Sequence, residues 1–233
     1  MVNEKYFKKP ILITGLPRSG TSLAAGILSL CGVWSGTTVT GTKDNIKGFY
    51  EHVGLREHVN KELLRRLKCD PLGVQRLPPV EGLPPSDNFK NVVLNIIQSD
   101  GYDGKKPWMF KDAKMLLLWP YYKQHFPNAS WVIVRRSREE VIDSCLRTGF
   151  MRQHTESAEF WNVWASEYEK RIELLKESGV KYYEIWASDL FDPNSRDTLR
   201  NLVRKLKLKW NEHKVGEFIE PKVWHGNKAK KSS

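Results

Sequence analysis

Two segments of this 233-residue chain place arginine and hydroxyl side chains between an apolar run and a helical pattern, and the first of them also contains two glycines at a spacing that suits phosphate binding. In the first, an apolar run at residues 11–13 leads into Gly15-Leu-Pro-Arg-Ser-Gly20, and apolar residues then recur at helical spacing over residues 21–31. The glycines let the backbone bend around an anion, while backbone amides and the dipole of the following helix favour negative charge. We therefore predict a phosphate loop between a buried strand and a helix.

The cation of this loop distinguishes it from the loops that bind ATP. A Walker A loop has lysine directly after the second glycine, where it contacts the β and γ phosphates. Here Thr21 follows Gly20, and Arg18 lies inside the loop, where a planar guanidinium suits a single terminal phosphate. An ordinary glycine turn before a core helix is the alternative. The predicted ligands are Pro17, Arg18, Ser19, Gly20, Thr21 and Ser22.

A second strand, turn and helix repeat this arrangement further along the chain. The apolar residues 130–134 predict a buried strand. Ser137 and Glu140 have the spacing of a capping box, in which the two side chains satisfy backbone amides at the start of a helix. A helix is therefore expected to begin directly after Ser137.

Arg136 and Ser144 belong to this second unit. Arg136 ends the strand, and Ser144 follows eight residues later, two turns into the helix on roughly the capped face. Arg135 is the alternative to Arg136 at the end of the strand. The simplest structural interpretation is that both arginines form ion pairs with Glu139 and Glu140.

Two further charged residues lie at the ends of expected elements. Glu51 precedes an amphipathic helix expected over residues 53–67, where a carboxylate would stabilise the helix dipole. Lys111 lies near the end of a short strand expected at 108–112. Ligands of α/β proteins bind at the carboxyl ends of parallel strands, although a solvated charge is the alternative for this lysine.

Together these segments resemble sulfotransferases that use 3′-phosphoadenosine 5′-phosphosulfate (PAPS). The Pro-Arg-Ser-Gly-Thr loop is most similar to the tyrosylprotein and bacterial-type branches. In the family an arginine at a strand end and a serine eight residues later hold the 3′-phosphate, and Arg136 and Ser144 match that pair. Asn45-Ile-Lys-Gly-Phe-Tyr-Glu51 and Lys111-Asp112 resemble two further segments of these branches.

The resemblance implies that the chain transfers a sulfonate group from PAPS to a hydroxyl acceptor without a metal and releases adenosine 3′,5′-bisphosphate. It implies Glu51 as the base, Lys111 facing the bridging and sulfonate oxygens, and Arg18 with the loop amides on the 5′-phosphate. The acceptor stays open between a saccharide, a small alcohol or phenol, and a peptide tyrosine. Three nearby residues are alternatives for the base: His52, His58 and Asp112.

The chain also departs from the family pattern. Arg136-Ser-Arg-Glu139 stands where Arg-Asp-Pro-Arg is usual, and Ala113 replaces the proline of Lys-Asp-Pro. Ala187-Ser-Asp-Leu190 replaces Tyr-Glu-Asp-Leu, so the aromatic residue usually found near the adenine is missing, with Trp186 beside its position. The adenine pocket is therefore not assigned from the sequence.

The charge balance favours an anionic partner. The chain has 38 Lys and Arg against 27 Asp and Glu, and residues 196–233 hold 11 of these basic residues against 4 acidic ones. This stretch is either a solvated basic face or a rim that attracts a charged nucleotide or an acidic acceptor. No apolar signal segment or stretch of transmembrane length occurs, which leads us to expect a cytoplasmic protein.

Alternating strands and helices predict parallel βαβ units, and hence an α/β fold with a P-loop NTPase-like parallel sheet and helices on both faces. The chain, 1–233, should form a single sulfotransferase-like domain. We expect a surface excursion at 69–85, where five prolines exclude regular structure, and a flexible basic tail at 227–233. The other expected helices are 86–97 with Ser86 as cap, 113–126, 157–178 and 193–206, and the last strand is 181–186. Cys31, Cys69 and Cys145 are expected to be reduced thiols, since their spacing fits no metal site.

Two other functions share some of these features. A nucleotide kinase or another P-loop NTPase has the same strand, loop and helix but requires a loop lysine and a magnesium-binding acid. A non-enzymatic nucleic-acid-binding protein is supported only by the charge and the basic tail. Arg18 together with Arg136 and Ser144 favours the sulfotransferase over both. Nucleic acid is therefore not an expected partner, and the sequence does not determine the oligomeric state.

Overall fold

The computed structural model describes residues 7–42, 45–190, 192 and 196–219. Within these residues a four-stranded sheet has the order β2-β1-β3-β4. All neighbouring strands are parallel, with Ile11 aligned to both Met109 and Ser130. The strands are β1 (Ile11–Gly15), β2 (Met109–Lys111), β3 (Ser130–Arg135) and β4 (Lys181–Trp186).

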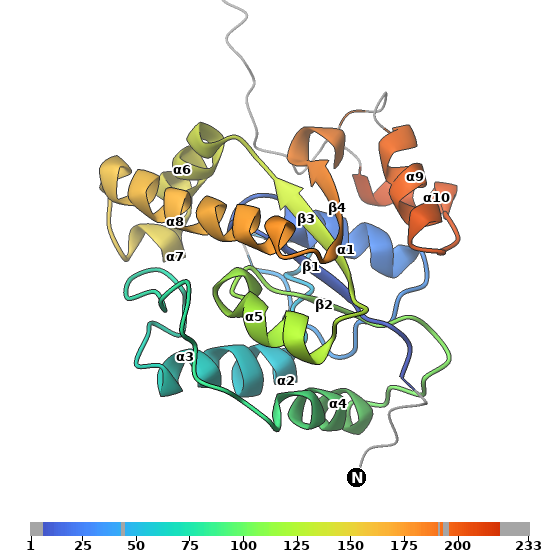
Figure 1. Cartoon of the computed structure of the whole chain (residues 1–233). Helices are drawn as coiled ribbons and strands as arrows, with labels where there is room; N and C mark the ends of the chain where they lie inside the picture. The colour runs from blue at the N-terminus through green and yellow to red at the C-terminus, as the bar shows by residue number, and fades with distance from the viewer. Residues whose placement is uncertain (1–6, 43–44, 191, 193–195, 220–233) are drawn as a thin grey trace, which may run out of the picture.

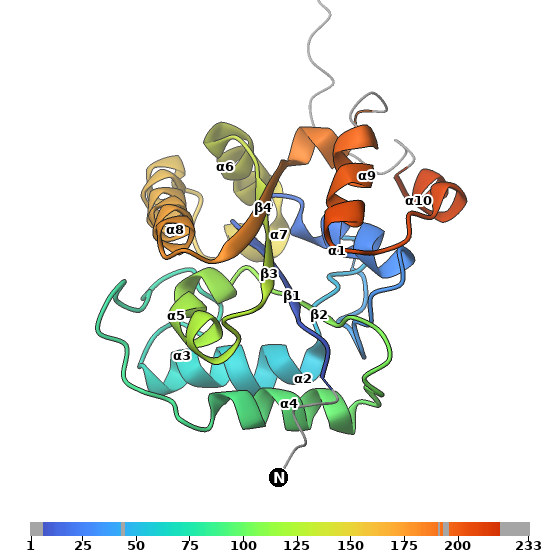
Figure 2. The ribbon, with the colours of Figure 1, turned by 45° about the vertical axis from the view of Figure 1, so that its right-hand side comes forward.

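Helices connect the strands and cover both faces of the sheet (Figure 1). Figure 2 shows α1, α9 and α10 on one side, and α2 to α5 with α8 on the other. The predicted α/β fold, a parallel sheet flanked by helices, is thus confirmed. The helical segments are α1 (Thr21–Leu30), α2 (Val53–Leu55), η2 (Arg56–Lys61), α3 (Glu62–Arg66), α4 (Phe89–Ser99), α5 (Met115–His125), α6 (Arg138–Arg147), α7 (Gly149–Arg152), α8 (Ala158–Glu177), η3 (Ala187–Leu190), α9 (Arg196–Lys205) and α10 (Glu212–Ile219).

The sheet separates two hydrophobic cores. Because successive side chains of a strand point to opposite faces, Leu12 and Trp131 pack in the larger core with residues of α4, α5 and α8. Ile13 and Val132 pack in the smaller core with residues of α1 and α9. All four are at most 1% exposed. This burial on both faces explains why the central strands β1 and β3 are nearly continuous apolar runs.

The excursion expected at residues 69–85 contains no helix or strand, as the prolines predicted. It is nevertheless tied to the core. The carbonyl oxygen of Gly73 accepts hydrogen bonds from Trp164 Nε1 (2.9 Å) and Tyr168 Oη (2.8 Å) of α8. The Asp70 carboxylate accepts three backbone amides of the same segment.

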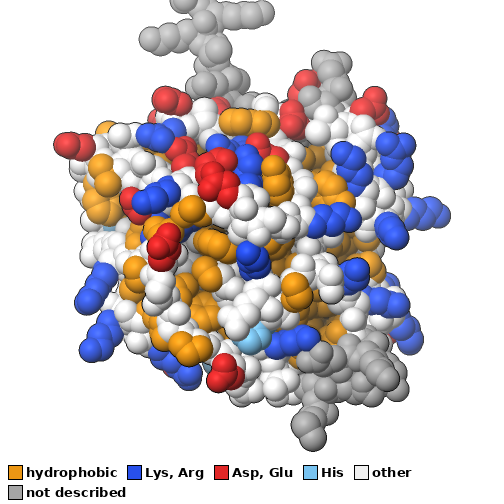
Figure 3. Space-filling model, in the orientation of Figure 1, with side chains coloured by type: hydrophobic (Ala, Val, Ile, Leu, Met, Phe, Trp, Pro, Cys, Tyr) orange, Lys and Arg blue, Asp and Glu red, His pale blue; other side chains and the backbone are white. Residues whose placement is uncertain are grey.

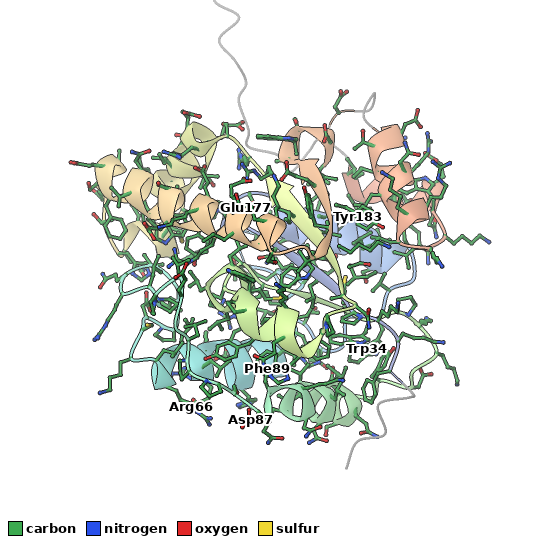
Figure 4. The ribbon with its side chains drawn as sticks, viewed as in Figure 1. Trp34, Arg66, Asp87, Phe89, Glu177 and Tyr183 are labelled. Carbon is green, nitrogen blue, oxygen red and sulfur yellow. The ribbon has the colours of Figure 1, made fainter. Side chains whose placement is uncertain are left out.

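The start of α4 differs from the prediction. The sequence suggested Ser86 as the cap, but Asn88 occupies that position, and the carbonyl oxygen of Ser86 accepts a hydrogen bond from the Phe89 amide at 3.0 Å. Phe89 lies between α4 and α5 (Figure 4), stacked on Tyr121 with its edge toward Tyr122. Burial of this ring therefore sets where the helix begins.

Figure 3 shows Lys and Arg side chains along the edge of the molecule formed by α9 and α10. Part of this charge is neutralised, since Arg200 pairs with Asp197 and with Glu212 of α10. The first residues of the expected helix 193–206, at 193–195, and the basic tail 227–233 lie outside the described residues.

Cys31 and Cys145 are buried and Cys69 is half-buried, and all three are free thiols. No helix in the described part of the chain is both long enough and apolar enough to cross a membrane.

Candidate active site

The turn between β1 and α1 bends tightly at the edge of the sheet. Arg18 (φ 72°) and Gly20 (φ 94°) adopt left-handed backbone conformations, and the Ser19 amide donates to the Leu16 carbonyl at 3.1 Å. A Cβ atom on Gly15 would lie 2.3 Å from the carbonyl oxygen of Val134, so only glycine fits beside β3. The turn opens onto the first amides of α1, which have no partner within the helix and carry the positive end of its dipole.

Arg18, Arg136 and Ser144 come from three different elements and lie in contact. The Nε of Arg18 donates to the hydroxyl of Ser144 at 3.0 Å. The Nη1 of Arg136 donates to the carbonyl oxygen of Arg18 at 3.1 Å. The sheet thus brings together the loop after β1, the end of β3 and the buried hydroxyl of α6.

The alternative ligand Arg135 points elsewhere. Its Nη1 donates to Glu173 of α8 at 2.9 Å, and its guanidinium lies 5.9 Å from the centre of the Trp186 ring. Half of the predicted capping box is present at the same turn: the Ser137 hydroxyl accepts the amide of Glu140 at 3.3 Å, and it donates to Oε2 of Glu140 at 3.1 Å. Arg136 rather than Arg135 is therefore the residue directed toward the first loop.

The position of Arg18 differs from the expected assignment of separate residues to the two phosphates. The resemblance placed Arg18 on one phosphate and the pair of Arg136 and Ser144 on another. In the structure the Arg18 guanidinium lies against Ser144 itself and 5.9 Å from the centre of the Phe150 ring. The three residues form one cluster, and the assignment of Arg18 to the 5′-phosphate stays a prediction.

Two polar atoms at this cluster are buried without a hydrogen-bond partner among the described residues: Ser19 Oγ and Arg136 Nε. Arg136 Nε forms an ion pair with Glu140 at 3.6 Å, a distance too long for a hydrogen bond. Buried polar groups are normally bonded. These unpartnered donors therefore fit the oxygen atoms of a bound anion, and the surrounding guanidinium and hydroxyl groups suit the phosphates of a nucleotide.

Glu51 and Lys111 form a buried ion pair beside this region. Lys111 Nζ lies 2.9 Å from Oε1 of Glu51, and Arg56 Nε lies 2.9 Å from Oε2. Burial alone would raise the pKa of Glu51, but the positive charges of Lys111, Lys114 and Arg56 lower it to about 2. Glu51 is therefore a carboxylate at neutral pH.

The loop that carries Glu51 is fixed by contacts with distant segments. The carbonyl oxygen of Glu51 accepts the Val39 amide at 2.8 Å, which pairs the residues before the helix with the earlier part of the loop. The Asn45 side chain donates to the hydroxyl of Ser22 at 3.4 Å. This contact ties the segment to the first turn of α1, next to the phosphate loop.

The two histidines considered as the base occupy other positions. His52 caps α2 by accepting the Leu55 amide at Nδ1 (3.3 Å), and its Nε2 lies 3.2 Å from the Asp100 carboxylate. Burial lowers the pKa of His52 despite that carboxylate. His58 lies on η2, and its side chain has no hydrogen bond or ion pair with the described residues. These positions favour Glu51 over either histidine.

Asp112, the third alternative, is fully buried and its oxygens are already bonded. Oδ1 accepts from the backbone amide and the Nζ of Lys114, at 2.9 and 2.8 Å. Oδ2 accepts from the side-chain amide of Asn60 at 2.9 Å, and Asn60 in turn accepts from the Tyr122 hydroxyl at 2.6 Å. This network gives Asp112 a structural role.

Asn60 was missed by the reasoning from sequence. The helix predicted over residues 53–67 is present, but its middle is the π-helical segment η2, which carries Asn60 into the core with no exposed surface. Such turns are frequent at functional sites. The sequence did contain one indication: Asn60 lies one turn before Leu64, on the apolar face of the predicted helix. A polar side chain buried there needs a hydrogen-bond partner.

The described residues contain no group of three or more His, Cys, Asp or Glu side chains placed to hold a metal ion.

A family model described as the sulfotransferase family matches residues 10–212. No curated protein matches the chain. Among solved structures, the sulfotransferase STF1 from Mycobacterium tuberculosis is similar, with 16% identity and a TM-score of 0.58 over 91% of this chain and 71% of that one. At this identity the likeness supports the fold.

Proposed function

The chain belongs to the sulfotransferase family, and we propose that it transfers the sulfonate group of PAPS to a hydroxyl group of an acceptor. The observation that carries this proposal is the cluster of Arg18, Arg136 and Ser144 beside the turn after β1. Two buried donors there, Ser19 Oγ and Arg136 Nε, have no hydrogen-bond partner in the described part of the chain. A nucleotide with separate 3′ and 5′ phosphates would satisfy both.

In the proposal, the phosphate loop and the start of α1 bind the 5′-phosphate through residues 17–22. Arg136 and Ser144 bind the 3′-phosphate. Arg18 belongs to the loop but touches Ser144, so its guanidinium can bind either phosphate from one position. Charge-assisted hydrogen bonds of this kind are about twice as strong as neutral ones.

PAPS supplies an activated sulfonate group and leaves as adenosine 3′,5′-bisphosphate. Lys111 extends from the carboxyl end of β2 and supplies positive charge where negative charge develops. Glu51 accepts the proton of the acceptor hydroxyl. The proposal assigns the neutralisation of charge to Lys111 and Arg18, and it involves no metal.

Adenosine 3′,5′-bisphosphate should raise the melting temperature in the presence of a metal chelator. At a concentration 100 times the Kd, binding stabilises the folded state by about 2.7 kcal/mol. ATP with magnesium and adenosine 5′-phosphate should each raise it less. The measurement is differential scanning fluorimetry with the three nucleotides at equal concentrations. A larger shift with ATP that requires magnesium would identify a P-loop kinase or NTPase instead.

Arg136→Ala and Ser144→Ala should each weaken bisphosphate binding about 10- to 100-fold, because each removes a donor to the 3′-phosphate worth about 1.5–3 kcal/mol. Calorimetric titration would measure the affinities for the bisphosphate and for adenosine 5′-phosphate, which lacks the 3′ group and should lose little. Arg135→Ala is the matched control, since that neighbouring arginine pairs with Glu173. Equal losses for both nucleotides would show that the pair does not recognise the 3′ end.

A further inference from the structure

The carboxylate of Glu51 is held by two cations that differ in position and exposure. Oε1 accepts from Lys111, which comes from β2 and has a side chain only 4% exposed. Oε2 forms an ion pair with the Nε of Arg56 at 2.9 Å, without the geometry of a hydrogen bond; Arg56 comes from the first turn of η2 and has a side chain 26% exposed. Oε1 thus contacts the more buried cation, Lys111, and Oε2 contacts the more exposed one, Arg56.

These two contacts conflict with proton transfer at the carboxylate. With Lys111, Lys114 and Arg56 in place, the pKa of Glu51 is about 2, although a useful base titrates nearer the working pH. In the proposed function Lys111 also has a second partner, the phosphosulfate group. If Lys111 leaves Glu51 for that group, Oε1 becomes free and the pKa of Glu51 rises, which makes Glu51 a stronger base. Glu51 would then also lose one of the two contacts that orient its carboxylate.

We propose that Arg56 is a positioning residue that keeps Oε2 of Glu51 in place while Lys111 turns from Oε1 to the donor, leaving Oε1 to face the acceptor hydroxyl. This inference rests on the proposed function. The acceptor oxygen bonds to sulfur as its proton passes to Oε1. The bond from sulfur to the bridging oxygen breaks, and the 5′-phosphate keeps that electron pair.

Arg56 is suited to this task because it is itself fixed. Its Nη1 donates to the carboxylate of Glu57, and Lys61 donates to the same oxygen of Glu57 at 2.9 Å. The remaining cation near Glu51 is Lys114 of the loop before α5, which is bound to Asp112 at 2.8 Å. Among the charged groups that face Glu51, Arg56 is therefore the one that contacts Oε2.

The test follows the Glu51 carboxyl carbon by NMR in the full chain labelled with ¹³C-glutamate, with Glu51→Gln used to identify its signal. Without nucleotide, the wild-type signal should stay that of a carboxylate down to about pH 3. In Arg56→Ala the pKa of Glu51 should rise measurably, because one of the three nearby positive charges is lost. Arg56→Lys should restore most of the effect.

Lys61→Ala is the matched control, since Lys61 shares Glu57 with Arg56 but does not touch Glu51. Its Glu51 titration should equal that of the wild type. If Arg56→Ala and Lys61→Ala titrate alike, Arg56 does not hold the carboxylate and the inference is wrong. Arg56→Gln, which keeps a polar side chain without charge, replaces Arg56→Ala if the latter does not fold.

The second arm adds PAPS without an acceptor. The pKa of Glu51 should rise in the wild type as Lys111 leaves Oε1, and it should rise further in Arg56→Ala. If the Glu51 signal is unchanged with PAPS bound, Lys111 does not turn from Glu51 to the donor, and that part of the inference is wrong. Failure of PAPS to bind at all would count against the proposed function, while the titration without nucleotide still decides whether Arg56 holds Glu51.

Discussion

Glu51→Gln should slow sulfonate transfer by about 10²- to 10⁴-fold while the affinity for adenosine 3′,5′-bisphosphate stays nearly constant. Glutamine has nearly the size of glutamate and can still accept a hydrogen bond, but it cannot take up the proton of the acceptor. Glu51 contacts Lys111 and Arg56 rather than the cluster of Arg18, Arg136 and Ser144. This variant should therefore lose catalytic rate but keep its affinity for the nucleotide.

The measurement is single-turnover transfer from ³⁵S-labelled PAPS to the acceptor that the wild type prefers among a phenol, a hexose and a tyrosine peptide. Glu62→Gln is the matched control, because Glu62 lies on the next helical turns, is partly exposed and pairs with Arg65 and Arg66 rather than with Arg56 or Lys111. Near-normal transfer in Glu51→Gln with a collapse in a His52 or His58 variant would move the base to that histidine. The phosphate assignments would then still stand.

Asp112→Ala should lower the free energy of unfolding by about 3–5 kcal/mol, the usual cost of breaking a buried ion pair by removing one partner. Asp112 has no exposed surface and bonds Lys114 and Asn60. Burial alone would lower the pKa of Lys114, yet the carboxylates of Asp112 and Glu51 raise it. The substitution therefore leaves a buried positive charge with one of its two carboxylates, and a buried amide without its acceptor.

Urea unfolding at neutral pH would measure this loss. The control is Asp103→Ala, which removes the exposed partner of Lys105 and should leave the free energy of unfolding nearly unchanged, because exposed ion pairs contribute little. Asp112→Ala combined with Lys114→Met should recover part of the loss, since the unpaired charge is then gone. A loss below about 1 kcal/mol in the single variant would show that the network of Asp112 contributes little to stability.

The strands and the longer helices of this protein could be predicted from its sequence because their signals are local, whereas the short helices α7 and α10 were not predicted. A buried strand is recognised as an apolar run and a helix as apolar residues three and four positions apart, and neither pattern depends on distant parts of the chain. Ser137 with Glu140 marked the start of α6 for the same reason. Spacing along one strand and helix also sufficed to select Arg136 and Ser144, since both lie in the same unit.

The order of the strands and the partners of the site residues needed the tertiary structure. Arg18 meets Ser144 across 126 positions, Lys111 meets Glu51 across 60, and Asn60 meets Asp112 across 52. No local pattern encodes such contacts. They follow from placing β1 between β2 and β3, which sets the phosphate loop beside the end of β3.

The sequence by itself thus determined which side chains could act, and the fold decided what each of them touches. Glu51 illustrates the difference. Its type and its place before a helix made it a candidate base, but its low pKa comes from cations on β2, on η2 and before α5. Electrostatic effects depend on distance through space, and for Glu51 those distances are set by a loop anchored at Ser22 and Val39.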